Sequence, residues 1–256
     1  MAEFRFYAEL ADFLPLHWRG RTFVHVVLPR QSVKHVIEAL GVPHTEVGLV
    51  LVNGEAVELN RLLSECDRVA VFPALSHLMP PQPGGDRRFA ADAHLGRLAR
   101  YLRFAGFDTI WDNAWKDADL VAVAADQGRV ILTRDRDLLM HKAVRSGCYV
   151  RDKDTLAQLT DVAHRYALDF SRPASGRCLE CNLPLRGVAK EAVIGRLPPR
   201  TGSVFDEFWY CEGCQRVYWR GSHWKRMRRA IASVAQLLPR SNCADPEPWA
   251  ASRQVV

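Results

Sequence analysis

The sequence lacks the features of a membrane or secreted protein. No run of about 18 apolar residues occurs in its 256 residues, so no transmembrane helix is predicted. The N-terminal segment MAEFRFYAEL contains Glu3 and Glu9 and lacks the basic segment and apolar run of a secretory signal. Seven cysteines are an odd number for a secreted disulfide scaffold. These absences predict a cytoplasmic location, where paired cysteines more often bind metal.

Positive charge is concentrated in one part of the chain. Residues 171–240 hold thirteen Lys or Arg against five Asp or Glu, whereas residues 1–80 hold seven against nine. A basic segment of this kind indicates a polyanionic partner such as RNA, with an ordinary solvated surface as the alternative.

Residues 1–78 predict a small β-rich domain. We expect a helix over Gln31–Leu40 and a hairpin turning at Asn53-Gly54. Strands are expected over 4–10, 21–28, 48–59 (both arms of the hairpin) and 67–75. This order resembles the ubiquitin-like β-grasp fold of the sulfur-carrier proteins of thiamin and molybdopterin synthesis. Those carriers act through a C-terminal Gly-Gly, whereas Gly84-Gly85 is followed here by more chain, so residues 79–87 are interpreted as a linker.

Residues 88–170 alternate between strand and helix patterns. This order predicts an α/β domain with a parallel sheet and helices on both faces. Ligands of such sheets bind beyond the carboxyl ends of the strands. Strands are expected over 87–92, 107–111, 129–133 and 148–150, and helices over 93–106, 117–127, from about 137, and 154–166.

Several aspartates fall at the carboxyl ends of these strands. Asp92 ends the first strand, Asp135 and Asp137 follow the strand VILT, and Asp117 and Asp119 begin a helix. Clustered carboxylates repel one another unless a cation neutralises them, and their hard oxygens suit Mg²⁺ or Mn²⁺. Such ions activate water for phosphodiester cleavage.

Helix capping is the alternative role for some of these aspartates. Asp117, Asp137 and Asp154 each stand where an N-cap would. The convergence of several acids at one sheet edge favours the metal hypothesis. Next to Asp92, Arg97, Arg100 and Arg103 recur at every third position, which fits either phosphate binding or a solvated helix face.

Two Cys-x-x-Cys pairs, separated by 29 residues, predict a zinc ribbon within residues 171–238. With four thiolates the zinc is structural, since no coordination position stays open; a redox-active pair is the alternative. Gly213 suits a tight turn in the second pair, and His223 is interpreted as a surface or RNA-contacting residue. The predicted ligands are Cys178, Cys181, Cys211 and Cys214.

Aromatic and basic residues alternate after the second pair. Tyr218, Trp219 and Trp224 could stack bases or pack on the core of the preceding α/β domain, and we assign the tryptophans mainly to packing. Residues 239–256 show no periodicity and are expected to form a loose tail. The predicted RNA-binding residues are Arg97, Arg100, Lys225, Arg226, Arg228 and Arg229.

Four segments carry a resemblance to a known family. FAADAHLGRLARYLRFAGFDT, DADLVAVAADQGRVILTRDRDLL, RCLECN and FWYCEGCQRVYWRGSHW resemble the Mut-seven C-terminal RNase domain, a PIN-like nuclease with a zinc ribbon, sometimes preceded by a ubiquitin-like domain. The resemblance implies a metal-dependent endoribonuclease acting on tRNA or another structured RNA. It implies that Asp92, Asp117 and Asp135 hold Mg²⁺ or Mn²⁺, with Asp137 assisting. No Glu stands between Asp92 and Asp117, where PIN domains usually place another acid, which indicates a compact or rearranged site.

Two alternative functions follow from other features. The basic ribbon could be a nucleic-acid-binding module without turnover, and the N-terminal unit could be a partner related to sulfur carriers. Because that unit is acidic and a Pro/Gly linker separates it from the rest of the chain, we expect it to be dispensable for cleavage but to influence the choice of partner or substrate.

Overall fold

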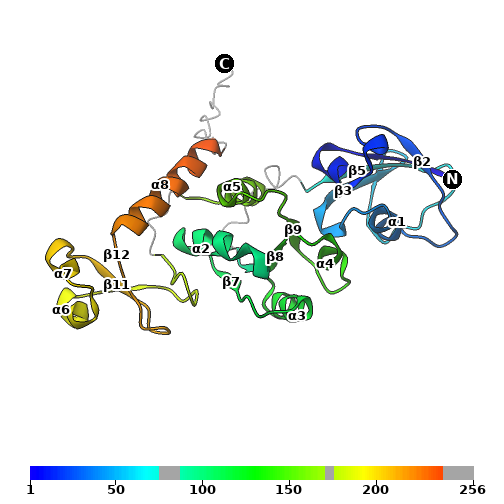
Figure 1. The fold of residues 1–256 in the computed structure, drawn as a ribbon. Helices are drawn as coiled ribbons and strands as arrows, with labels where there is room; N and C mark the ends of the chain where they lie inside the picture. The colour runs from blue at the N-terminus through cyan, green and yellow to red at the C-terminus, as the bar shows by residue number, and fades with distance from the viewer. Residues whose placement is uncertain (75–86, 171–175, 239–256) are drawn as a thin grey trace, which may run out of the picture.

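The computed structural model describes residues 1–74, 87–170 and 176–238. Three parts follow one another, with the parallel-sheet domain between the other two (Figure 1). The linker residues up to Asp86, including Gly84-Gly85, and the predicted tail 239–256 lie outside the described residues. In the described part, no helix combines the length and apolar character that crossing a membrane requires.

The N-terminal domain is a five-stranded sheet of order β2-β1-β5-β3-β4, which confirms the β-grasp prediction. β1 and β5 pair in parallel, and the remaining pairs are antiparallel. One part of the prediction is wrong, because a φ of 48° at Ala8 ends the first strand and a 3-10 helix replaces its second half. The elements are β1 (Ala2–Phe6), η1 (Ala8–Phe13), η2 (Leu16–Trp18), β2 (Phe23–His25), α1 (Val33–Ala39), η3 (His44–Glu46), β3 (Val47–Val52), β4 (Glu55–Val57) and β5 (Arg68–Pro73).

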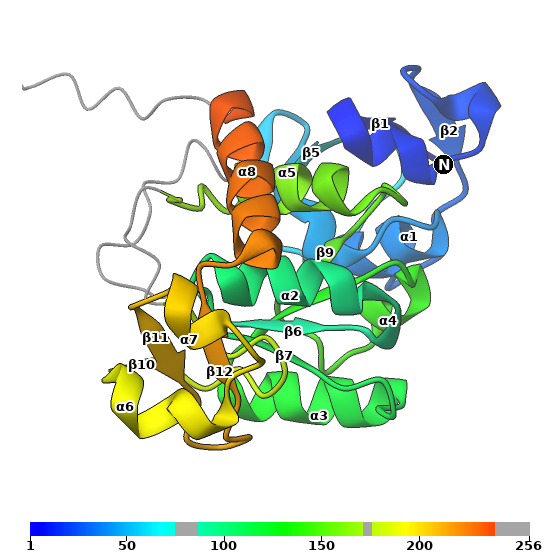
Figure 2. The same ribbon diagram turned by 60° about the vertical axis from the view of Figure 1, so that its left-hand side comes forward.

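The middle domain is a four-stranded, fully parallel sheet of order β7-β6-β8-β9. Figure 2 shows α2 and α5 on one face and α3 on the other. Neighbouring β6 residues explain the two layers: Phe89 and Ala91 join the core under α2 and α5, and Ala90 joins the core under α3 and α4. The elements are β6 (Phe89–Ala91), η4 (Ala93–Leu95), α2 (Gly96–Phe104), β7 (Thr109–Trp111), α3 (Asp117–Gln127), β8 (Val130–Thr133), α4 (Arg136–Met140), β9 (Gly147–Tyr149) and α5 (Thr155–Arg165).

The C-terminal part is a three-stranded antiparallel sheet followed by a long helix. Met227, Ile231 and Val234 of that helix, α8, are buried in the core of the middle domain. The predicted ribbon unit, 171–238, therefore shares a core with the parallel-sheet domain. Its elements are β10 (Arg186–Val188), α6 (Lys190–Val193), η5 (Ile194–Arg196), α7 (Thr201–Val204), β11 (Phe208–Tyr210), β12 (Val217–Trp219) and α8 (Ser222–Leu237).

Candidate active site and zinc site

A cavity of about 400 Å³ brings the predicted aspartates together. β6 and β8 are adjacent parallel strands, with Ala91 opposite Leu132, so the residues that follow them emerge side by side. The first turns of α3 and α4 supply the remaining acids. The cavity is lined by Asp92, His94, Asp117, Arg134, Asp135, Arg136 and Asp137.

Asp92 is held in place by a buried threonine. The Thr133 hydroxyl donates to Asp92 Oδ2 at 2.6 Å and accepts from the Asp135 backbone N–H at 2.9 Å. Thr133 is fully buried, so this link between the two strand ends is shielded from water. It fixes the carboxylate of Asp92 relative to the start of α4.

The capping alternative is wrong for two of the three aspartates. Asp154 does cap α5, accepting from the N–H groups of Leu156 and Ala157. The N-cap of α3 is Lys116, however, and the N-cap of α4 is Asp135. Asp117 and Asp137 therefore stand in the first turns of their helices without a cap bond, because each helix begins one or two residues earlier than the capping hypothesis requires.

Asp135 combines a cap with a place in the cavity. Its Oδ1 accepts from Asp137 N at 2.8 Å and Leu138 N at 3.3 Å. Its Oδ2 has no hydrogen-bond partner among the described residues. One carboxylate can thus begin the helix and still present an oxygen to a ligand.

The donor set of the cavity fits a hard divalent cation. Asp92, Asp117, Asp135 and Asp137 form no ion pair with any described residue, and Arg134 and Arg136 line the same cavity without pairing with them. Of the described residues, the cysteines alone provide three or more ligand atoms all within 4.8 Å of one another. The carboxylates are more widely spread, which suits Mg²⁺, since this ion usually takes one or two carboxylates and completes its shell with water and substrate phosphate.

The four predicted cysteines form a compact cluster. Their Sγ atoms all lie within 4.8 Å of one another, with 3.4 Å between Cys178 and Cys214 and 3.3 Å between Cys181 and Cys211. Burial, followed by hydrogen bonds with the neighbouring thiols, raises the pKa of Cys214 to about 12. Four thiol groups this close together fit a tetrahedral zinc ion, whose charge would stabilise them as thiolates.

The two knuckles repeat one backbone pattern, which corrects the argument about Gly213. Asn182 N donates to Cys178 O, and Gln215 N donates to Cys211 O, at 3.0 and 2.9 Å. The residues with positive φ are Asn182 and Gln215, at 66° and 59°. A Cβ at Gly213 would lie 2.6 Å from Leu183 Cδ1, so a larger residue there would displace the exposed side chain of Leu183.

Comparison with known proteins assigns the family. The model of the Mut7-C RNAse domain matches residues 87–231, and that of the Mut7-C ubiquitin matches residues 1–79. The chain belongs to the Mut7-C RNAse domain family. Its function class is therefore that of a nuclease.

Two solved structures are similar to part of this Mut7-C protein, each at 25% sequence identity. Small archaeal modifier protein 1 of H. volcanii covers 29% of this chain and 97% of its own, with a TM-score of 0.24. SAMP1 from Haloferax volcanii covers 33% and 98%, with a TM-score of 0.23. No curated protein matches the chain.

Three residues of the Mut7-C cavity were not among the predicted site residues. His94 follows Asp92 by two positions, and Arg134 and Arg136 alternate with the aspartates of the segment TRDRD. The alternation of arginine and aspartate in this segment could have predicted their place, because residues next to a metal-binding side chain at a strand end tend to line the same cavity.

The arginines of α2 do not form one surface. Arg97 is exposed, and Arg100 donates to Glu180 at 2.8 Å. Arg103 is only 2% exposed and donates to the carbonyl groups of Thr109, Leu179 and Glu180. Arg103 therefore joins the Mut7-C sheet to the first zinc knuckle, the turn formed by Cys178–Cys181. Neither phosphate binding nor a solvated helix face, the two roles considered for these arginines, includes this one.

In the ribbon and α8, aromatic side chains pack, and one basic residue, Arg220, lies over the rings of Trp209 and Trp224. Trp224 packs edge-on against Phe104, with 6.1 Å between ring centroids. The Tyr218 hydroxyl lies 3.1 Å from Cys178 Sγ, which makes it a support of the zinc site. The exposed side chains are those of Lys225, Arg226, Arg228 and Arg229, and His223 is exposed beside them.

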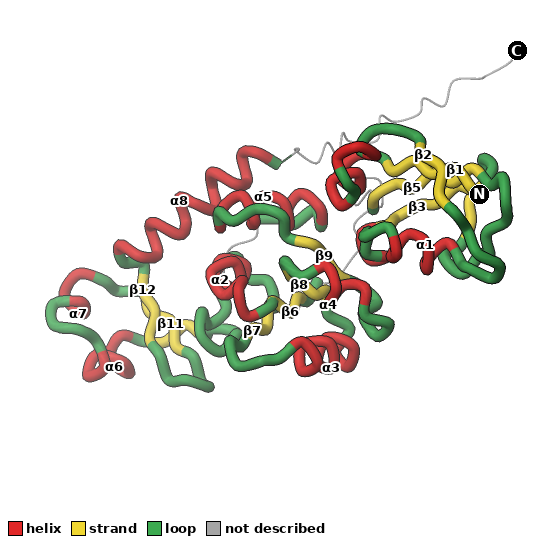
Figure 3. The backbone as a smooth tube through the Cα atoms, turned by 45° about the vertical axis from the view of Figure 1, so that its right-hand side comes forward, coloured by secondary structure: helices red, strands yellow, loops and turns green. Residues whose placement is uncertain are grey.

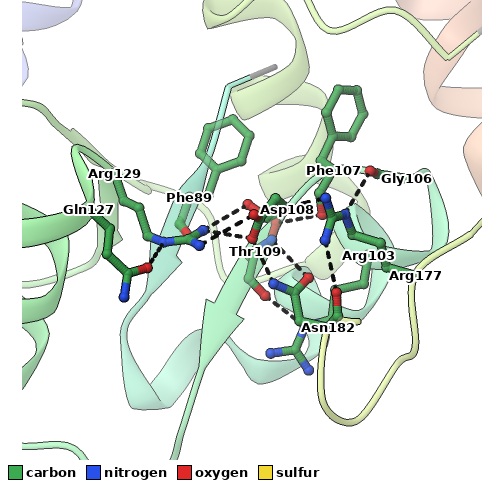
Figure 4. Close-up of polar contacts among 10 residues, drawn as sticks. All are labelled: Phe89, Arg103, Gly106, Phe107, Asp108, Thr109, Gln127, Arg129, Arg177 and Asn182. Carbon is green, nitrogen blue, oxygen red and sulfur yellow. Dashed lines mark hydrogen bonds and ion pairs between the residues drawn. The ribbon is translucent and has the colours of Figure 1, made fainter. Parts of the chain in front are cut away.

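Asp108 forms a second junction between the sheet and the ribbon (Figure 4). It accepts from Arg129 at 2.7 Å and from Asn182, next to the first knuckle, also at 2.7 Å. Burial alone would raise the pKa of Asp108, but the hydrogen bonds from Arg129 and Asn182 bring it below the ordinary value of 3.8.

We expect Asp108→Ala to destabilise the protein by about 2 kcal/mol at pH 7, since it leaves Arg129 buried without its partner. Because the folded pKa is lowered, the contribution of the carboxylate is complete above about pH 4 and is lost as pH falls through the folded pKa. Thermal unfolding between pH 7 and pH 3 should show the gap between wild type and variant closing in acid. The exposed Asp126→Ala serves as the control, and a gap that is constant with pH would contradict the assignment.

Proposed function

We propose that this protein is a divalent-metal-dependent endoribonuclease that hydrolyses phosphodiester bonds of a structured RNA such as tRNA. The observation that carries the proposal is the cavity at the carboxyl edge of the parallel sheet, lined by four aspartates from three segments: the end of β6, the start of α3 and the start of α4. The family assignment supports the same reaction class.

The residues of the cavity divide the work. Asp92, Asp117 and Asp135 would hold Mg²⁺ or Mn²⁺, with Asp137 assisting. When bound, the metal supplies activation of water and neutralises charge on the phosphate. Thr133 keeps Asp92 oriented through its 2.6 Å hydrogen bond, and Asp135 is oriented by the start of α4.

The direct test is to incubate the purified protein with labelled tRNA and other structured RNAs. Cleavage with Mn²⁺ or Mg²⁺ that stops in EDTA is the expected result. Internal products with defined ends would establish the endonucleolytic mode. Binding of RNA without any cleavage under all metal conditions would instead favour the second candidate.

That second candidate is a nucleic-acid-binding module without turnover. The basic cluster of α8, defined as Lys225, Arg226, Arg228 and Arg229, favours it, because all four side chains are exposed on a helix whose opposite face is buried. The cluster is also compatible with the nuclease proposal, where it would supply affinity and not chemistry.

Neutralising the basic cluster with glutamine should weaken RNA binding and flatten its salt dependence. Each lost contact to a single-stranded phosphate chain lowers the log–log slope by about 0.7. Fluorescence anisotropy over a salt series measures this slope. Arg5, Arg21, Arg30 and Arg61, four exposed residues of the N-terminal domain, replaced together by glutamine control for the loss of four charges. Equal slopes for wild type and the cluster variant would show that the cluster does not bind RNA and is an ordinary solvated surface.

The sulfur-carrier alternative requires a processed Gly-Gly end. Intact-mass measurement of the protein from cells would show a product ending at Gly85 if that alternative holds. The ubiquitin-like domain packs against the nuclease domain, which favours a permanent association of the two domains instead of a released carrier.

A further inference from the structure

Two arginines of the cavity have no partner to neutralise them. Arg134 and Arg136 are exposed, and neither forms a hydrogen bond or ion pair with any described residue. A guanidinium group presents a planar set of donors that matches two phosphate oxygens. Free arginines beside metal-binding carboxylates therefore suit a ligand that brings both phosphate oxygens and negative charge.

Arg136 also lies against the ubiquitin-like domain. A Cβ added at Gly41, which follows α1, would be 3.7 Å from Arg136 Nη1 and 3.6 Å from the Phe13 carbonyl oxygen. The φ of Gly41 is 92°, a conformation that favours glycine. A residue of the ubiquitin-like domain thus lies beside the guanidinium group of Arg136, although the residues that line the cavity all belong to the nuclease domain.

A buried acid fixes this domain in place. Glu46 is 1% exposed, and its carboxylate accepts from Tyr149 N at 2.8 Å and from Arg165 at 2.7 Å, with Arg151 at 3.4 Å. Tyr149 belongs to β9, the edge strand of the nuclease sheet. Glu46 thus satisfies a backbone N–H that an edge strand would otherwise leave unpaired.

Aromatic and polar contacts extend the same interface. The Phe13 and Tyr149 rings meet edge to face, with 5.1 Å between centroids, and His44 Nε2 lies 2.9 Å from Val144 O. Figure 3 shows β9 and α4 on the side of the nuclease domain that faces the ubiquitin-like domain. These contacts give reason to revise the expectation that the domain is dispensable.

We propose that Arg136 binds a phosphate of the RNA chain and that the ubiquitin-like domain positions it by packing against α4, the helix that Arg136 begins. The inference rests on the proposed nuclease function and adds a positioning role to a domain that the sequence suggested was separate. Glu46 fixes η3 on β9, η3 packs against α4, and Arg136 at the start of α4 lines the cavity.

The test is a double-mutant cycle in the full-length protein, with KM and kcat measured on a labelled structured RNA such as tRNA. Arg136→Gln should raise KM by about tenfold, as for the loss of one charge-assisted hydrogen bond. The KM of Arg136→Lys should lie between those of the wild type and Arg136→Gln, since lysine keeps the charge without the planar donors. The control is Arg145→Gln, an exposed arginine outside the cavity, which should leave KM unchanged.

The second arm of the cycle is Glu46→Ala, which should raise KM by loosening η3 and, through it, α4. Combining it with Arg136→Gln should raise KM no further than Arg136→Gln alone, because Glu46 affects KM only through Arg136. If Glu46→Ala unfolds at the assay temperature, the isosteric Glu46→Gln replaces it. Multiplicative effects of the two changes, or equal behaviour of Arg136→Gln and Arg145→Gln, would overturn the proposal.

RNA binding in EDTA separates this inference from the nuclease proposal. If the wild type binds RNA but never cleaves it, the nuclease proposal fails, and dissociation constants replace KM in the same cycle. Weaker binding by Arg136→Gln than by Arg145→Gln would then still support the phosphate site, whereas equal binding would reject it.

Discussion

Asp92→Asn is expected to lower the rate of RNA cleavage by at least about a hundredfold, as when one electrostatic contributor to a transition state is removed. Asparagine keeps a side-chain oxygen that can accept the Thr133 hydroxyl, so the local hydrogen bonding survives. What disappears is one negative charge among the four carboxylates of the cavity. Because like charges repel, the melting temperature of the metal-free variant should hold or rise.

Three further substitutions locate the effect in the cavity. Asp126→Asn changes an exposed acid of α3 outside the cavity and should cleave like the wild type. Asp154→Ala removes the cap of α5 and should cost about 1 kcal/mol of stability with activity intact. Asp117→Ala, which removes no cap bond, should lower the cleavage rate and leave the stability unchanged. Full activity in both Asp92→Asn and Asp135→Asn would end the nuclease proposal at this cavity.

Local chemistry explains why the elements and the convergence of the aspartates could be predicted from the sequence. Asn53-Gly54 accepts positive φ in a hairpin turn, and the structure has φ values of 55° and 92° there. The alternation of strands and helices requires parallel crossovers, and the carboxyl ends of parallel strands lie at one edge of the sheet. Asp92 and Asp135 meet at this edge because their strands, β6 and β8, are neighbours.

The contacts between domains could not be predicted in this way. Glu46 and Arg165 are 119 positions apart, and nothing in either local pattern distinguishes them from surface residues. Arg103 repeats the spacing of Arg97 and Arg100, yet it is buried because the carbonyl groups of the first knuckle lie above it. A sequence period describes one element, whereas these roles depend on the surface against which that element packs.

The same limit applies to helix ends. The capping hypothesis assigned Asp117 and Asp137, but the caps are Lys116 and Asp135. A shift of one or two residues turns a cap into a free carboxylate, and such boundaries are the least certain part of any assignment from pattern. Here the shift leaves two carboxylates without cap bonds and available to a ligand.

Cys211→Ser is expected to abolish zinc binding at the ribbon. Elemental analysis of protein purified without chelators should give one zinc per wild-type chain and none for the variant, with Cys66→Ser, outside the cluster, retaining the metal. The binding free energy of a structural zinc is on the order of 10 kcal/mol, and it is folding free energy for the part that the metal organises. Absence of zinc from the wild type, or one equivalent in Cys211→Ser, would contradict the assignment.

The damage should reach beyond the ribbon, because the first knuckle completes the nuclease domain. Arg103 donates to the carbonyl groups of Leu179 and Glu180, and Asn182 donates to Asp108. Once the knuckle unfolds, Arg103 loses these acceptors while its other bond, to Thr109, holds it in the interior. We therefore expect the melting transition of the nuclease domain to fall in Cys211→Ser while that of the ubiquitin-like domain changes little. An unchanged nuclease transition would show that the ribbon folds independently and that the Arg103 junction contributes nothing to the sheet beneath it.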